Sequence, residues 1–160
     1  MRTCSFTGHR QIKKEHIKEL PELVLRAINY AYTNGCRRFI AGGALGFDTV
    51  AAREVIKFKM RHPDVSLVLF LPCLAQDSKW KPQQKKLYEY LLSEASEVVY
   101  VSEEYTDTCM KERNRKIAEE SDILIAYVSR TNSGAAQTVR MAHELGREIY
   151  NLYPALDRHE

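Results

Sequence analysis

Apolar residues along this chain gather in six short runs, separated by longer stretches in which they recur every three or four positions. Two of the runs, 67–71 and 123–126, are continuously apolar, which is typical of strands covered on both faces of a parallel sheet. The strands predicted from all six runs are 2–6, 37–41, 66–71, 97–101, 122–127 and 148–152.

The stretches between these strands have the spacing of amphipathic helices. The predicted helices are 14–33, 47–60, 83–92, 110–120 and 135–145. In the first of them Pro21 interrupts an apolar stripe that runs from Ile17 to Ala31, so the helix either kinks there or begins afresh with Pro21 in its first turn. Asn34 and Gly35 then supply its C-terminal stop.

The regular alternation of strand and helix predicts an α/β fold: Rossmann-like and doubly wound, with a mainly parallel sheet and helices on both faces. We expect the first strand at the centre and the strands around it in the order 3-2-1-4-5. No linker, repeat or low-complexity stretch divides the chain. We therefore expect a single domain over residues 1–153, followed by a short tail, 154–160, that frays.

Composition adds mainly exclusions. The chain is 44% hydrophobic and 28% charged, as globular domains are, and its net charge of +3 does not by itself indicate nucleic acid. No run of about 18 apolar residues and no signal-peptide core is present, so we expect a cytoplasmic protein without a membrane partner. The cysteines form no zinc knuckle and no CxxC pair, which predicts buried reduced thiols and no metal; they are Cys4, Cys36, Cys73 and Cys109.

In an open parallel sheet, ligands bind beyond the carboxyl ends of the strands, where the strand order reverses. The loop after the second strand contains Gly42, Gly43 and Gly46 directly before a helix. Glycines let the backbone approach a ligand closely, and a helix N-terminus favours an anion. The alternative is a tight strand-to-helix turn without a ligand, with Asp48 or Thr49 as the N-cap.

Two more loops on the same edge have similar chemistry. Ser133 and Gly134 follow the fifth strand and open the last helix. Gly8, His9 and Arg10 follow the first strand, and the arginine offers a bidentate clamp for an anion. Three small-residue turns on one edge favour a phosphate-bearing ligand over packing alone.

Four further residues are candidates with two interpretations each. Arg113 and Asn114 lie in the first turns of the fourth helix, either as exposed contacts to the same cleft, dispensable for folding, or as part of a solvated charged face. Trp80 either stacks on a base or packs its own loop down. His9 either acts as an acid or base or hydrogen-bonds within its turn. Cys109 has no obvious base nearby, so we interpret it as structural.

The chain resembles the YpsA-like branch of the SLOG superfamily in four segments that cover almost its whole length: Thr7-Gly8-His9-Arg10, Gly42-Gly43-Ala44-Leu45-Gly46-Phe47-Asp48, Arg113-Asn114 and Ser133-Gly134. That superfamily also contains the LOG phosphoribohydrolases and the Smf/DprA proteins. The resemblance implies binding of a nucleotide or a nucleotide-derived molecule, no required cofactor, and a homodimer.

The chain departs from the LOG enzymes at one decisive position. Arg113 resembles their active-site arginine and is therefore the candidate catalytic residue. Those enzymes also carry a PGGxGTxxE signature after the fifth strand, and its glutamate supports cleavage of an N-glycosidic bond. In this chain only Gly134 remains of the three glycines, and Arg140 stands at the position of the glutamate. Half of the catalytic pair is therefore missing.

Three functional hypotheses follow, in this order. The first is a sensor-type binding domain for a phosphate-bearing nucleotide derivative. The second is an N-glycoside hydrolase acting on a nucleoside monophosphate, with Arg113 and an unidentified acid. The third is single-stranded DNA binding as in the Smf/DprA relatives, which requires a basic groove with stacking aromatics. Because the charge is near balance, we do not expect a nucleic-acid partner.

Overall fold

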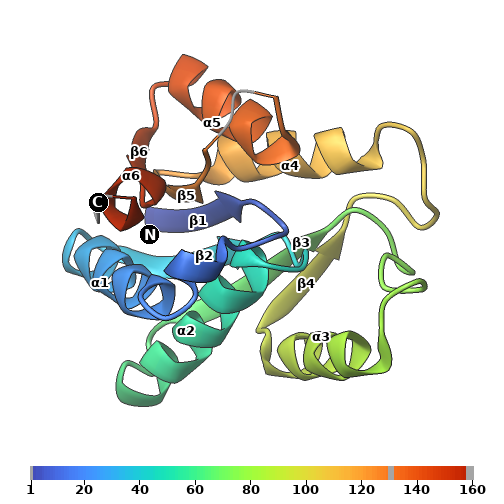
Figure 1. Cartoon of the computed structure of the whole chain (residues 1–160), viewed down its shortest axis with the longest axis horizontal. Coiled ribbons are helices and arrows are strands. Elements are labelled where there is room, and N and C mark those ends of the chain that lie inside the picture. The colour runs from blue at the N-terminus through green and yellow to red at the C-terminus, as the bar shows by residue number, and fades with distance from the viewer. Residues whose placement is uncertain (1, 130–131, 158–160) are drawn as a thin grey trace.

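In the computed structural model, which describes residues 2–129 and 132–157, one six-stranded sheet forms the centre of the molecule (Figure 1). Every strand pair in it is parallel, as the apolar runs predicted. The strands are β1 (Arg2–Gly8), β2 (Cys36–Ala41), β3 (Ser66–Leu71), β4 (Glu97–Tyr100), β5 (Ile123–Tyr127) and β6 (Glu148–Asn151).

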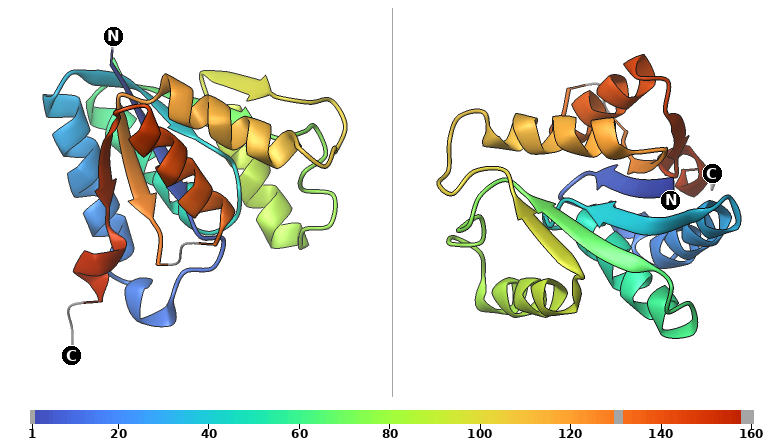
Figure 2. Two further views of the ribbon diagram at one scale, coloured as in Figure 1. Left: turned by 90° about the horizontal axis from the view of Figure 1, so that it is seen from above. Right: turned by 180° about the vertical axis from the view of Figure 1, so that it is seen from behind.

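Helices cover both faces of this sheet. The helices are α1 (Leu20–Thr33), α2 (Phe47–Arg61), α3 (Pro82–Glu94), α4 (Cys109–Glu120), α5 (Gly134–Glu144) and the short α6 (Tyr153–Leu156), and a 3-10 turn, η1 (Lys14–His16), precedes α1. In Figures 1 and 2 the first three helices lie on one side of the sheet, and α4 and α5 lie on the other. The predicted Rossmann-like α/β fold is therefore confirmed.

The predicted strand order was wrong in one place. The observed order is β4-β3-β2-β1-β5-β6, so β4 extends the sheet outside β3, and β5 takes the position beside β1. Burial explains the difference, because β5 is buried at every residue whereas Glu97 and Tyr100 of β4 are exposed. A half-exposed strand belongs at an edge, and a continuously apolar strand belongs in the middle.

The first predicted helix is divided near Pro21, which was one of the two alternatives that the sequence left open. The helix α1 begins afresh at Leu20 with Pro21 in its first turn, where a missing N–H costs no hydrogen bond. Ile17 therefore lies outside the helix and is 57% exposed, although the apolar stripe had included it. His16, in the turn before it, is buried instead.

The expectation that the tail frays from residue 154 was wrong for its first part. Residues 153–156 form α6, and Leu156 is buried against the core. The chain is held there because the Leu152 N–H donates to the Ala126 carbonyl at 2.8 Å, which continues the ladder of β5 and β6. The last three residues of the tail lie outside the described part.

Two hydrophobic layers fix the strand ends. The larger one lies under α1, α2 and α3 and includes Phe6, Phe39 and Phe47. The smaller one joins Phe70 of β3 to Ile117 of α4. After β4 the chain returns across the sheet to β5, so the strand order reverses between β1 and β5, and a ligand site is expected outside their carboxyl ends. None of the described helices is long and apolar enough to cross a bilayer.

Candidate functional site

A cleft of about 1070 Å³ opens where the strand order reverses, beyond the carboxyl ends of β1 and β5. This is the position that the doubly wound topology predicts for a ligand. Nine of the residues proposed from the sequence line it: Gly8, His9, Arg10, Gly46, Asp48, Arg113, Asn114, Ser133 and Gly134. Gly42 and Gly43 are absent from the lining.

Gly42 and Gly43 are required by packing. A Cβ on Gly43, whose φ is +71°, would lie 2.2 Å from the side chain of Leu71 in the core. A Cβ on Gly42 would lie 2.8 Å from both the Asp48 carboxylate and the Arg113 guanidinium. For these two glycines the structural alternative holds, and a substitution there acts through folding.

Gly46, in contrast, faces the cleft and joins two of its loops. Its φ is +81°, and a Cβ there would lie 2.2 Å from the carbonyl oxygen of Arg10. The Phe47 N–H donates to the His9 carbonyl at 3.1 Å, so the loop after β1 packs directly against the start of α2. The alternative without a ligand placed the N-cap at Asp48 or Thr49, and this part of it was wrong, because Gly46 occupies that position.

The start of α5 forms the opposite wall of the cleft. Ser133 is its N-cap, and its Oγ accepts a hydrogen bond from the Ala136 N–H at 3.0 Å. Since the oxygen of this hydroxyl accepts from the helix, α5 can offer a ligand the Ser133 O–H as a donor and the backbone amides of its first turn. Gly134 and Ala135 both line the cleft. Residues 130 and 131 of the same loop lie outside the described residues.

Arg113 and Asn114 connect the two glycine turns. The Arg113 guanidinium donates to the carbonyls of Gly42 and Phe70 and to the Asn114 side chain, and Asn114 donates in turn to the carbonyl of Gly134 at 3.5 Å. Arg113 lines the cleft, as one interpretation predicted, but it is only 5% exposed, so the expected exposure and the solvated charged face were both wrong. Its removal is expected to disturb the fold as well as the cleft.

Asp48 is the one carboxylate among the described residues that line the cleft. Burial raises its pKa to about 6, although Arg113, the Ala44 N–H and Arg10 all favour the ionised form. Its Oδ2 accepts from the Ala44 N–H at 3.2 Å, while its Oδ1 is buried with no hydrogen-bond partner among the described residues. A buried unpaired carboxylate oxygen costs stability, as residues retained at functional sites often do.

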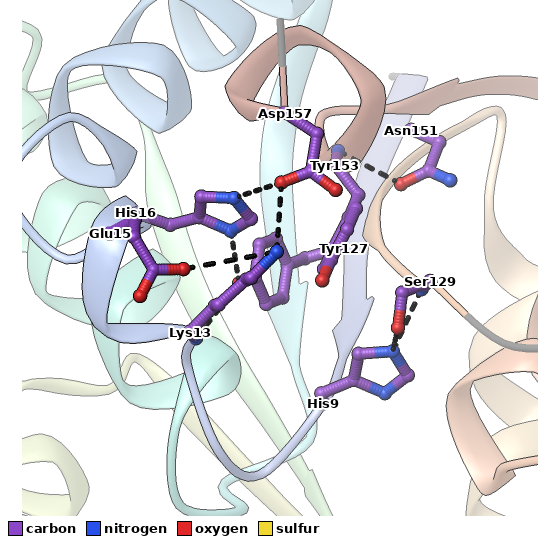
Figure 3. Close-up of polar contacts among 9 residues, drawn as sticks. All are labelled: His9, Lys13, Glu15, His16, Tyr127, Ser129, Asn151, Tyr153 and Asp157. Carbon is purple, nitrogen blue, oxygen red and sulfur yellow. Dashed lines mark hydrogen bonds and ion pairs between the residues drawn. The ribbon is translucent and has the colours of Figure 1, made fainter. Parts of the chain in front are cut away.

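Two other candidates support the walls of the cleft. The His9 Nε2 accepts from the Ser129 N–H at 2.8 Å and thereby bridges the loops after β1 and β5 (Figure 3). The predicted alternative was a hydrogen bond within the turn of His9, whereas this partner belongs to another loop; the bond requires an unprotonated Nε2. Trp80 packs edge-on against Tyr88 at 5.1 Å between ring centroids, and both also line the cleft.

Sequence reasoning missed three lining residues near the reversal point, namely Lys13, Tyr127 and Tyr153. Tyr127 is the last residue of β5, and a position at the end of a central strand is a signal that could have identified it. Lys13 and Tyr153 carry no such signal, because the first lies in an irregular loop and the second in the segment expected to fray. The free cysteines in the described part are all buried, as predicted.

Comparison with known proteins places the chain in a family. The model of the YpsA family, which is described as the YspA SLOG family, matches residues 6–153 of this chain. This chain belongs to that family. It is 27% identical to the SPbeta prophage-derived protein YoqJ of Bacillus subtilis (strain 168), over 90% of this chain and 88% of that protein. It is 25% identical to a UPF0398 protein of Bacillus thuringiensis (strain Al Hakam), over 96% of this chain and 88% of that protein.

Several solved structures share the architecture of this chain. DNA processing protein A (DprA) from Streptococcus pneumoniae aligns with a TM-score of 0.65 and 18% identity over 94% of this chain, which spans only 50% of that protein. DprA from Helicobacter pylori, described for its single-stranded DNA binding mode, aligns with a TM-score of 0.64 and 19% identity. The alignment covers 92% of this chain and 63% of that protein. TM1055 aligns with a TM-score of 0.60 and 17% identity, over 93% of this chain and 72% of that protein. These likenesses show the fold.

Proposed function

We propose that this SLOG chain is a sensor-type binding domain that holds a phosphate-bearing nucleotide, or a small molecule derived from one, in the cleft at the reversal point. The observation that carries the proposal is the charge of the lining. Three cationic side chains, Arg10, Lys13 and Arg113, face a single carboxylate, Asp48, among the described lining residues. Such a cleft favours an anion.

The backbone supports the same ligand class. The helices α2 and α5 both begin at the cleft, and the N-terminus of a helix attracts phosphate through its free N–H groups and its dipole. Aromatic residues line the cleft as well, including Trp80, Tyr127 and Tyr153, and they offer apolar faces to a base. Phosphate and base therefore have complementary groups in the same cleft.

Replacing Arg10 with alanine should weaken binding about ten- to a hundredfold, because a charge-assisted hydrogen bond contributes about 1.5–3 kcal/mol. Arg10 is exposed at the cleft, so the fold should tolerate the change. The measurement is calorimetric titration with AMP and with ADP-ribose. Arg26→Ala is the matched control, since Arg26 is exposed on α1 away from the lining. Equal affinities in the two variants would remove Arg10 from the site.

The same titration separates the two alternative functions. Adding an oligodeoxythymidine tests single-stranded DNA, which the likeness to DprA keeps open and which we still predict to bind weakly. Following AMP for release of free adenine tests the hydrolase hypothesis, for which Asp48 is the available acid. Arg140, at the position of the LOG glutamate, lies outside the lining. If the wild type binds no nucleotide below millimolar concentrations, the proposed function is wrong.

A homodimer is a further part of the proposal, because closed two-fold dimers are the commonest soluble homo-oligomers. Size-exclusion chromatography with light scattering should give twice the chain mass of 18.5 kDa. A mass of one chain at high micromolar concentration would contradict it.

A further inference from the structure

Three segments far apart in the sequence meet in a hydrogen-bonded network at one end of the cleft (Figure 3). His16 of η1 is 1% exposed, and it lies between Tyr127 at the end of β5 and Asp157 after α6. The His16 Nδ1 is 2.7 Å from the Tyr127 hydroxyl, and the His16 Nε2 is 2.6 Å from an Asp157 carboxylate oxygen. The short distances and the burial of His16 make this a well-defined structural element.

The partners of His16 determine the direction of each bond. The Asp157 carboxylate accepts, so the Nε2 of His16 carries a proton and donates it. In the neutral tautomer of His16 that carries its proton on Nε2, the Tyr127 hydroxyl accepts from the backbone N–H of Lys13 at 3.1 Å and donates its own proton to the Nδ1 of His16. The network therefore fixes Asp157 on one side and the backbone of Lys13 on the other.

The same Asp157 oxygen also contacts the Lys13 ammonium, at 3.4 Å. Glu15 lies on the other side of that ammonium, at 3.8 Å. The hydrogen bond to Asp157 raises the pKa of Lys13, and the hydrogen bond from His16 lowers the pKa of Asp157, as expected for a charged pair. Lys13 lines the cleft together with Tyr127 and Tyr153. The Asp157 carboxylate of the chain itself thus pairs with Lys13, a cation of the cleft.

We propose that Lys13 forms a second anion subsite of the cleft, and that Asp157, held in place by His16, occupies this subsite as a tethered carboxylate until an anionic group of the ligand displaces it. The inference rests on the proposed function and narrows the ligand class. The ligand carries a second anionic group, such as a further phosphate or a carboxylate, in addition to the phosphate at the helix N-termini.

Competition for one ammonium has a definite thermodynamic consequence. A ligand anion and Asp157 cannot both take Lys13, so removing the charge of Asp157 should tighten anion binding. Both side chains are partly exposed, at 47% for Lys13 and 41% for Asp157, and an exposed pair interacts weakly. The expected gain is therefore about fivefold, the lower end of couplings between sites. A merely structural clamp predicts the opposite sign, because loosening it would weaken binding.

The test uses inorganic pyrophosphate as the probe and compares Asp157→Asn with Asp64→Asn. Asp64 is a matched control, since it is also an exposed carboxylate that pairs with a cation, here Arg37, and accepts one further hydrogen bond, here from Tyr32; it lies outside the cleft. Asp157→Asn should bind pyrophosphate about fivefold more tightly than the wild type, and Asp64→Asn should match the wild type. Adding Lys13→Gln to Asp157→Asn should abolish the gain. Unchanged or weaker binding by folded Asp157→Asn overturns the proposal.

A second measurement needs no variant. The imidazole N–H of His16 that donates to Asp157 is buried and should give a resolved proton resonance in NMR spectra. Pyrophosphate should shift this resonance as Asp157 leaves Lys13, and a resonance that stays in place at saturation overturns the proposal. If AMP binds to the protein but pyrophosphate does not shift this resonance, only the Lys13 subsite fails. If the resonance responds but no nucleotide binds, the nucleotide function fails.

Discussion

Replacing Gly46 with alanine should destabilise the protein by about 4 kcal/mol. The backbone there has a φ of +81°, which costs a non-glycine residue about 1–3 kcal/mol. The added methyl group would also lie 2.2 Å from the Arg10 carbonyl oxygen, and such overpacking typically costs about 1–3 kcal/mol more. Because this contact joins the loops after β1 and β2, the loss should appear in both urea unfolding and ligand binding.

Gly146→Ala is the matched control for this change. Gly146 has a similar φ of +74°, but a Cβ there meets nothing within 4 Å. Only the conformational cost applies, so the expected loss is about 1 kcal/mol. Equal losses at the two positions would show that the close approach of the added methyl group to the Arg10 carbonyl oxygen costs no stability.

The second large effect concerns Asp48 and pH. Its folded-state pKa of about 6 lies above the ordinary value of 3.8, so the folded protein binds this proton more tightly than the unfolded chain does. The contribution of Asp48 to stability is therefore full below pH 3.8 and is lost as the pH rises through 6. A shift of about two pKa units corresponds to about 3 kcal/mol.

The measurement is urea unfolding of wild type and Asp48→Asn across this range of pH. The free energy of unfolding of Asp48→Asn, relative to that of the wild type, should rise by about 3 kcal/mol from the acid to the neutral end of this pH range, since asparagine does not titrate. Asp64→Asn provides the control of opposite sign, because a hydrogen bond from Tyr32 lowers the pKa of Asp64 and that carboxylate stabilises the protein more as the pH rises. A constant difference between wild type and Asp48→Asn would contradict the assigned burial of this carboxylate.

Local patterns were sufficient for most of the fold. Continuous apolar runs such as that of β5 and the helical spacing between strands depend on near neighbours alone, so they predicted the elements and the parallel sheet. The placement of β4 at the edge depends on which strand is more apolar. The sequence does carry that signal, since Glu97 and Tyr100 flank only two valines in β4.

The candidate site was less accessible to sequence reasoning. The glycine turns and Arg10 were recognisable because their chemistry is local and their loops share one edge of the sheet. The burial of Arg113 was not recognisable, because two of its partners, the carbonyl of Gly42 just after β2 and the carbonyl of Phe70 in β3, are distant in sequence. The network of His16 and Asp157 spans more than a hundred residues, and no spacing rule connects such positions.

The central claim is that phosphate binds between the N-termini of α2 and α5. The most direct measurement is an NMR titration of the labelled protein with AMP, following the backbone amides. The largest shifts should gather at the first turns of the two helices, among Asp48, Thr49, Gly134 and Ala135. Shifts that gather on the exposed face of α4 or at the β4 edge at saturation, or no shifts up to millimolar AMP, would contradict it.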